Sequence, residues 1–176
     1  MPRLPLLCEG EMSHDQREQF ARFPSNLTRA LLLTDRRLAR AIPEVANAVR
    51  ASSLESPLRE AAILRVAYLC GSAYERMQHY EQALKCGWSD DDIAALEAGR
   101  VEGFSPQIRA AIDFVGECVT HANVSDMTFQ RVKELLAASA IVTLIFLVGH
   151  YMAVARFVTI LDIPLDEKPD RWLQEH

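Results

Sequence analysis

A serine, a glutamate and a histidine follow one another at a spacing that supports proton transfer. Ser72, Glu75 and His79 are three and four residues apart, so a helix places all three on one face. A histidine gives and takes a proton near neutral pH, and a carboxylate hydrogen-bonded to one ring nitrogen fixes its tautomer and raises its basicity. The segment therefore presents a candidate acid–base site with His79 as the proton carrier.

Glu60 is a second carboxylate that the expected topology brings to His79. The helix that begins at Pro57 should end at Cys70-Gly71, and a short turn there makes it the neighbour of the helix that follows. Glu60 then lies beside His79, while Glu75 precedes His79 by one turn. The catalytic candidates are His79, Glu60 and Glu75.

The same residues also have a purely structural interpretation. Ser72-Ala73-Tyr74-Glu75 matches the capping box S-x-x-E, in which Ser72 accepts from the amide of Glu75 and the Glu75 side chain returns a bond to Ser72. A Glu–His pair one turn apart is also common on helix surfaces. Glu75 is therefore left open between helix cap and catalyst.

Cysteine spacing limits the redox and metal chemistry. Cys70 offers a thiol close to His79, and it is either a redox group or a small buried hydrophobe. The four cysteines, Cys8, Cys70, Cys86 and Cys118, form no C-x-x-C pair and suit neither zinc nor a disulfide framework. We expect free thiols in a reducing, cytoplasmic setting, with no metal and no cofactor.

Four further residues are candidates for contact with a small-molecule substrate: Ser72, Tyr74, Arg65 and His150. His150 interrupts the most apolar segment of the chain. A buried histidine needs a partner, so it either lines a pocket or is a satisfied core residue. Arg65, like Arg156, interrupts an apolar helix face, and it either binds a substrate carboxylate, pairs with Glu60 or lies exposed.

Length and charge exclude several classes of protein. The chain has 176 residues, enough for one domain with a core, and a net charge of −5. It shows no basic face of the kind that nucleic-acid binders carry. The apolar segment 140–155 is interrupted by polar residues and is shorter than the ~18 apolar residues of a membrane span. We interpret it as a central or subunit-interface helix, with no membrane or nucleic-acid partner.

The pattern of breakers and caps predicts an all-α fold without strands. Because proline disfavours helix in the residue before it, Pro43 should separate a helix over 35–42 from another over 44–49. The other expected helices span 15–23, 27–33, 57–69, 72–85, 90–98, 106–121, 126–137 and 139–161. We divide the chain into an N-terminal arm (1–25), a helical domain (26–166) and a polar tail (167–176).

Three stretches resemble the carboxymuconolactone decarboxylase-like family, which includes the alkyl hydroperoxide reductase D-like proteins. They are LREAAILRVAYLCGSAYERMQH (58–79), ALKCGWSDDDIAAL (83–96) and GHYMAVARFVTILDIPLD (149–166). The resemblance implies an alkyl hydroperoxide reductase D-like helical fold, a trimer or hexamer, and a site between the two central helices.

In the peroxidase-like members, that site has a glutamate on the first helix and C-x-x-C-x-x-x-H on the second. Carried over, the glutamate falls on Glu60, the histidine on His79, and the two cysteines on Ser72 and Glu75. Disulfide exchange needs a thiolate at those positions, so this chain cannot use that mechanism. The decarboxylase members share E-x-x-x-H, which falls on Glu75 and His79.

The resulting expectation is a cofactor-free acid–base enzyme of this family that acts on a small organic acid or lactone by decarboxylation or related lyase or isomerase chemistry. Two alternatives stay open. One is a thiol-dependent, peroxidase-like antioxidant protein that uses Cys70. The other is a non-catalytic oligomeric binding protein, which predicts no deep pocket at His79.

Overall fold

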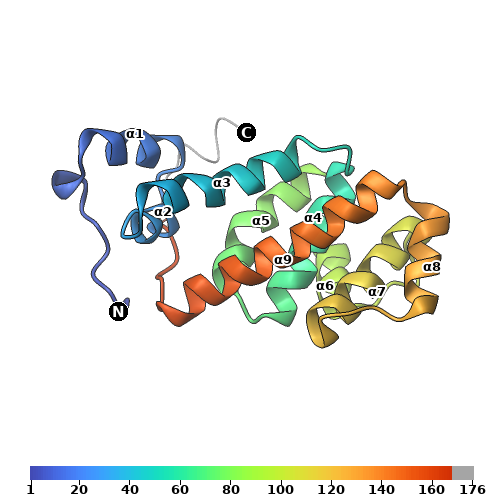
Figure 1. Cartoon of the computed structure of the whole chain (residues 1–176). Coiled ribbons are helices and arrows are strands. Elements are labelled where there is room, and N and C mark those ends of the chain that lie inside the picture. The colour runs from blue at the N-terminus through green and yellow to red at the C-terminus, as the bar shows by residue number, and fades with distance from the viewer. Residues whose placement is uncertain (168–176) are drawn as a thin grey trace.

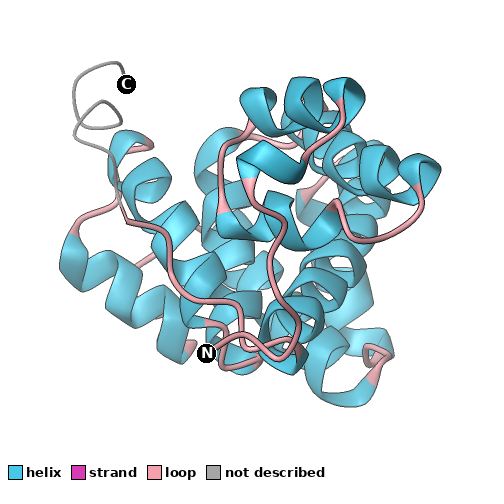
Figure 2. Cartoon of the chain, turned by 90° about the vertical axis from the view of Figure 1, so that its left-hand side faces the viewer, coloured by secondary structure: helices cyan, strands magenta, loops and turns pink. Residues whose placement is uncertain are grey.

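The computed structural model describes residues 1–167, and every regular element in that range is a helix (Figures 1 and 2). This confirms the all-α prediction for the described residues. The elements are η1 (Glu9–Glu11), α1 (His14–Arg22), α2 (Asn26–Leu31), α3 (Arg36–Arg50), α4 (Ser56–Leu69), α5 (Ala73–Lys85), α6 (Asp90–Ala98), α7 (Pro106–His121), α8 (Asp126–Leu135) and α9 (Ala138–Ile160).

The centre of the fold is α4, which packs against α5, α6, α7 and α9. Its sequence is apolar on nearly all sides, and nine of its residues between Leu58 and Ala67 are buried. A helix surrounded in this way buries any charge it carries, and Arg59 and Glu60 are both buried. The fold thus places two ionisable groups at its centre, where they need partners.

Helices α1 and α2 lie at the end of the molecule that holds both the N-terminus and the end of α9, and α3 runs from there toward the middle (Figure 1). The amide of Arg3 donates to the carbonyl of Leu161 at 2.8 Å. The amide of Asn26, at the start of α2, donates to Asp166 at 2.6 Å. Residues 1–25 therefore contain α1 and contact the C-terminal segment; of the expected polar tail, residues 168–176 lie outside the described range.

Serine caps begin most of the helices. The side chains of six serines accept from an amide in the first turn of their helices: Ser13, Ser25, Ser72, Ser89, Ser105 and Ser125. Each such bond satisfies one amide that a helix start leaves unpaired. Gly87 and Gly99 follow α5 and α6 with positive φ, as expected for glycines that end helices.

The predicted break at Pro43 is wrong, because α3 runs without interruption from Arg36 to Arg50 with Pro43 inside it. Proline removes one backbone hydrogen bond from a helix, but tertiary packing can outweigh that cost. Here α3 packs against α9, and Ala39 and Val49 are buried. As a result, residues on both sides of Pro43 share one helix face.

Within the described residues, α9 is the one helix that is long and apolar enough to cross a membrane. In its most apolar stretch of 18 residues, 39% is buried. Its inner face packs into the core through Ile141, Leu144, Leu147, Val148 and Tyr151. A core helix of a soluble protein passes the same test of length and composition.

Candidate active site

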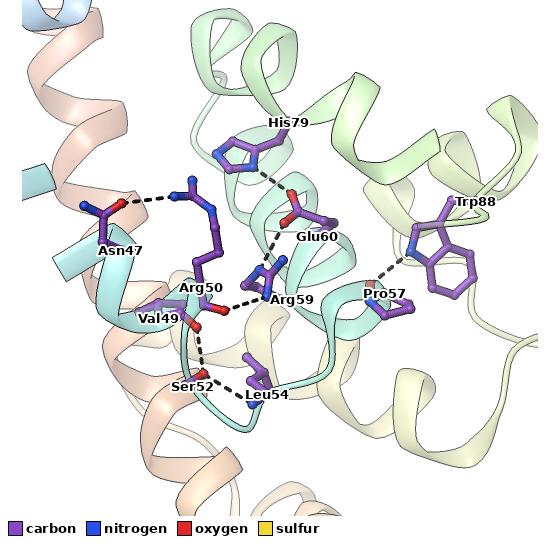
Figure 3. A network of polar contacts seen from close by, with 10 residues as sticks. All are labelled: Asn47, Val49, Arg50, Ser52, Leu54, Pro57, Arg59, Glu60, His79 and Trp88. Atoms are coloured by element: carbon purple, nitrogen blue, oxygen red, sulfur yellow. Dashed lines mark hydrogen bonds and ion pairs between the residues drawn. The ribbon is translucent and has the colours of Figure 1, made fainter. Parts of the chain in front are cut away.

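His79 and Glu60 form a hydrogen-bonded pair between α5 and α4, as the sequence predicted. The Nδ1 atom of His79 lies 2.8 Å from Oε2 of Glu60 (Figure 3). The turn at Cys70-Gly71 reverses the chain, and Gly71 takes the left-handed conformation that this turn requires, with φ of 64°. The two central helices therefore bring the pair together from positions 19 residues apart.

The environment of Glu60 keeps its carboxylate ionised. Burial raises the pKa of Glu60, but the hydrogen bond and charge of His79, together with the Arg59 guanidinium, lower it further, so that it ends below its usual value. Nε of Arg59 lies 3.1 Å from Oε1 of Glu60. An ionised carboxylate only accepts hydrogen bonds, so Nδ1 of His79 carries a hydrogen and Nε2 is the ring nitrogen left for other chemistry.

Glu75 is a buried carboxyl group of the opposite character. It lies one turn before His79 with a relative exposure of 3%, and neither of its carboxyl oxygens has a hydrogen-bond partner among the described residues. Burial raises the pKa of Glu75 to about 8, and the nearby Ser72 hydroxyl opposes this only in part. Glu75 is therefore mostly protonated at neutral pH, when Glu60 is ionised.

The capping box that the sequence suggested is only half formed. Ser72 accepts from the amide of Glu75 at 3.4 Å, but the Glu75 side chain returns no bond to Ser72. The complete box is thus a wrong prediction. Capping accounts for Ser72 and leaves the buried Glu75 carboxyl without a structural explanation.

A cavity of about 350 Å³ lies in front of His79 and Glu75. Helix α5 supplies Tyr74, Glu75, Gln78 and His79, and α9 supplies His150, Tyr151 and Val154. The opposite walls come from α1 to α3 and are largely apolar, with Phe23, Leu27, Leu31, Leu32, Ile42, Pro43 and Ala46 among them. This size and lining are typical of a site for a small organic molecule.

The ring of Tyr151 links the two histidines of the cavity. It meets His79 edge-on with ring centroids 5.0 Å apart, and it meets His150 edge-on at 5.2 Å. Burial, and then the charge of His79, lower the pKa of His150, which favours its neutral form. His150 thus lines the cavity, the first of the two alternatives that the sequence left open.

Of the other predicted contact residues, the structure brings Tyr74 to the cavity and leaves Arg65 elsewhere. The Tyr74 hydroxyl donates to Asp166 at 2.5 Å and accepts from the amide of Leu27 at 3.1 Å. Arg65 faces α6, where its Nη1 donates to the carbonyl of Glu97 at 2.5 Å. It lies five residues after Glu60 on α4, a spacing that turns it away from the face shared with His79.

Cys70 does not line the cavity either, and its thiol is poorly suited to redox chemistry. Burial raises the pKa of Cys70, with a further contribution from Glu75, although Arg156 lowers it. The thiolate, which is the reactive form, is therefore disfavoured. All four cysteines are free thiols.

The cavity also contradicts the simplest form of the non-catalytic alternative, which predicted no deep pocket at His79. Among the described residues, no cluster of three or more histidine, cysteine, aspartate or glutamate side chains is arranged to hold a metal ion. The groups that the structure gathers here are suited to moving protons.

A model of the carboxymuconolactone decarboxylase family matches residues 36–117, which include Glu60, Glu75 and His79. The matched part of the chain belongs to the carboxymuconolactone decarboxylase family. A comparison with curated protein sequences finds no match. In this matched part, Ser72 and Glu75 stand at the positions where the resemblance to peroxidase-like members places the redox cysteines.

Solved structures share the fold over most of the chain. An uncharacterized peroxidase-related protein with an alkylhydroperoxidase AhpD core, from Ralstonia eutropha JMP134, has a TM-score of 0.81 at 13% identity, covering 95% of this chain and 93% of its own. The debrominase Bmp8, as a cysteine-to-alanine variant with 2,3,4-tribromopyrrole, has a TM-score of 0.77 at 15% identity. Its alignment covers 97% of this chain and 95% of the debrominase. An Agrobacterium tumefaciens protein of unknown function, suggested to be an antioxidant defence protein AhpD, has a TM-score of 0.68 at 20% identity. Its alignment covers 73% of this chain and 90% of the Agrobacterium protein. These likenesses confirm the AhpD-like fold and leave the activity open.

Three arginines that the sequence did not mark as site residues also line the cavity: Arg22, Arg40 and Arg50. Two of them are neutralised by ion pairs: Arg22 with Glu44 at 2.8 Å, and Arg40 with Asp15. The sequence does contain a pattern that predicts this wall: one continuous helix would place Ala39, Pro43, Ala46, Asn47 and Arg50 on the same face. The predicted break at Pro43 divided these residues between two helices, so the shared face was not recognised.

Proposed function

We propose that this carboxymuconolactone decarboxylase-family protein is a cofactor-free acid–base enzyme that acts on a small organic acid or lactone by decarboxylation or related lyase or isomerase chemistry. The observation that carries the proposal is the presence of two carboxyl groups near His79: Glu60 contacts its Nδ1, and Glu75 lies one turn before it on α5 and lines the same cavity. Glu60 is held ionised and Glu75 is held protonated. Separation of two carboxyl pKa values by their surroundings is how one site holds a base and an acid at the same pH.

In a decarboxylation, the bond between the substrate carbon and the carboxylate breaks, and its electron pair stays on the substrate as an enolate-like carbanion. The protonated Glu75 donates a hydrogen bond to the enolate oxygen and stabilises the negative charge. His79 in its protonated form delivers the proton to carbon from Nε2, and Glu60 holds the ring through Nδ1. Water then returns a proton to His79, which completes the cycle.

The first experiment is an activity screen of the wild-type protein and His79→Ala against a panel of muconolactones, related lactones and small organic acids. Loss of a general acid typically lowers turnover by about 10²–10⁴-fold. His121→Ala is the matched control, because His121 is exposed at the end of α7. Unchanged turnover in His79→Ala would remove the role assigned to His79.

We further propose self-association, as a trimer or hexamer, through the outer face of α9. That face exposes Val142, Ile145, Phe146, Gly149, Ala153 and Ile160, and α9 carries no charged side chain before Arg156. A second copy can bury the uncharged part of this stripe, from Val142 to Ala153, against its own, since symmetric contacts are self-complementary. Sedimentation should give an oligomer for the wild type and a smaller species for Phe146→Glu, with Phe129→Glu on α8 as control. A monomeric wild type would overturn this proposal.

The proposed setting is the cytoplasm, with a small molecule as the partner of the cavity and neither membrane nor nucleic acid as a partner. The four free thiols are compatible with a reducing compartment. The net charge of −5 does not favour a polyanionic partner.

A further inference from the structure

Arg50 is the cavity arginine whose charge has no partner in the described part of the chain. It lies at the end of α3, and its Nη1 donates to the side-chain oxygen of Asn47 at 3.1 Å (Figure 3). No carboxylate of the described residues lies within ion-pair distance of its guanidinium, unlike those of Arg22 and Arg40. A guanidinium with free donors is suited to a carboxylate, which it can bind through two parallel hydrogen bonds.

The rest of the cavity leaves that positive charge uncompensated. The one acidic side chain on its wall is Glu75, among the described residues, and this group is mostly neutral at pH 7. The ionised Glu60 is absent from the wall and is already paired with His79 and Arg59. A cationic ligand would meet Arg50 with no anion to balance it, whereas an anionic ligand would supply the missing charge.

Arg50 is connected to His79 by a short chain of contacts: the Arg50 carbonyl accepts from Arg59, and Arg59 shares the Glu60 carboxylate with His79 (Figure 3). Burial raises the pKa of Tyr151, as does the charge of Glu60, while Arg50 is near enough to lower it. The Tyr151 ring in turn contacts His79. Because Arg50, Glu75 and His79 line the same cavity, a ligand held by Arg50 occupies the space that the other two side chains border.

We infer that Arg50 is the anchor for a carboxylate of the substrate, so that the site takes a small carboxylic acid with an apolar ring or chain. This inference rests on the proposed function and specifies its substrate class. The apolar side chains of α2 and α3 surround the body of the ligand, and the cavity of about 350 Å³ suits a single ring with substituents.

The anchoring carboxylate is the binding group and not the group that reacts. An ion pair with Arg50 stabilises the carboxylate as an anion, and loss of CO2 would remove the charge to which Arg50 binds. The substrate therefore carries another functional group, such as a carbonyl or lactone, toward the buried oxygens of Glu75, which have no partner among the described residues.

The test measures binding by calorimetry, with benzoate and cyclohexanecarboxylate as probes and benzamide as the neutral counterpart of benzoate. The wild type should bind the two acids, and Arg50→Met should bind them about tenfold more weakly or worse, since a hydrogen bond to a charged group is of this order. Benzamide should bind more weakly than benzoate and equally to both proteins, which shows that Arg50→Met leaves the cavity intact. Arg37→Met, an exposed arginine of α3 outside the cavity wall, should bind as the wild type does.

The inference is overturned if the acids bind Arg50→Met as tightly as the wild type, if benzamide matches benzoate, or if neither acid binds. Its failure is distinct from failure of the proposed reaction. Binding that depends on Arg50 supports the anchor even when His79→Ala leaves turnover of every panel compound unchanged. Conversely, turnover that needs His79 but binding that ignores Arg50 leaves the reaction standing and removes the anchor.

Discussion

Replacing Glu75 by glutamine should abolish a specific pH dependence of stability. Glutamine has nearly the same shape and no charge. Glu75→Gln therefore keeps the packing and the hydrogen bond that the backbone amide of residue 75 donates to Ser72. In the wild type the pKa of Glu75 rises from a usual 4.5 to about 8 because the group is buried. The native state therefore keeps a proton that the unfolded chain has already lost over this pH range.

The direction and the size of the effect of pH on stability follow from the difference between the pKa of Glu75 in the folded and the unfolded protein. Because the unfolded state binds fewer protons between about pH 4.5 and 8, stability falls as pH rises through this window. One pKa unit corresponds to about 1.4 kcal/mol, so Glu75 removes on the order of 3 kcal/mol between pH 5 and 8. For a protein of this size that is roughly 6–12 °C in melting temperature.

The assay is thermal and urea unfolding of both proteins at intervals across this range of pH. Titration of every other group affects both proteins alike, so the difference in free energy of unfolding isolates Glu75. The free energy of unfolding of Glu75→Gln, relative to that of the wild type, should increase steadily from about pH 5 to pH 8 and become constant above about pH 8. Glu134→Gln, on the exposed surface of α8, should show no such gain. Parallel curves for Glu75→Gln and the wild type would refute the assignment of Glu75 as a buried, protonated acid.

Two further predictions concern the frame of the site. Pro43→Ala should stabilise the protein by about 1–2 kcal/mol in urea unfolding, because alanine restores an amide hydrogen bond inside α3; a destabilised variant would mean that the proline ring is needed for packing. Gly99→Ala should cost about 1–2 kcal/mol, because Gly99 has φ of 74° and an added Cβ would lie 2.8 Å from Nη2 of Arg65. Gly103→Ala, where a Cβ meets nothing within 4 Å, is its control, and equal stability of the two variants would contradict this account of Gly99.

The sequence was informative where local rules decide the structure. Serine caps and helix-ending glycines act within a few residues, and they predicted most helix boundaries. The Glu60–His79 pair was also predictable, because a short turn between two helices makes them neighbours and the family motif marks the same two residues.

What the sequence could not provide depends on packing between distant elements. Pro43 signals a break locally, and only the contact of α3 with α9 explains why the helix continues. The S-x-x-E pattern predicted a capping role for Glu75, yet its carboxyl is buried at the cavity wall. Arg50 gains its significance from a cavity built by five helices, which no single stretch of sequence describes.

In the proposed mechanism His79 delivers a proton to carbon, while Glu60 holds its ring through Nδ1 and Glu75 stabilises the enolate. Turnover of the acid and lactone panel in D2O, followed by mass spectrometry and NMR of the products, tests this claim most directly. If His79 is the proton donor, the product carries one deuterium on the carbon that was protonated, and His79→Ala forms it about 10²–10⁴-fold more slowly than the wild type. Equal rates and equal labelling in the two proteins would contradict it, as would turnover that leaves the carbon unlabelled.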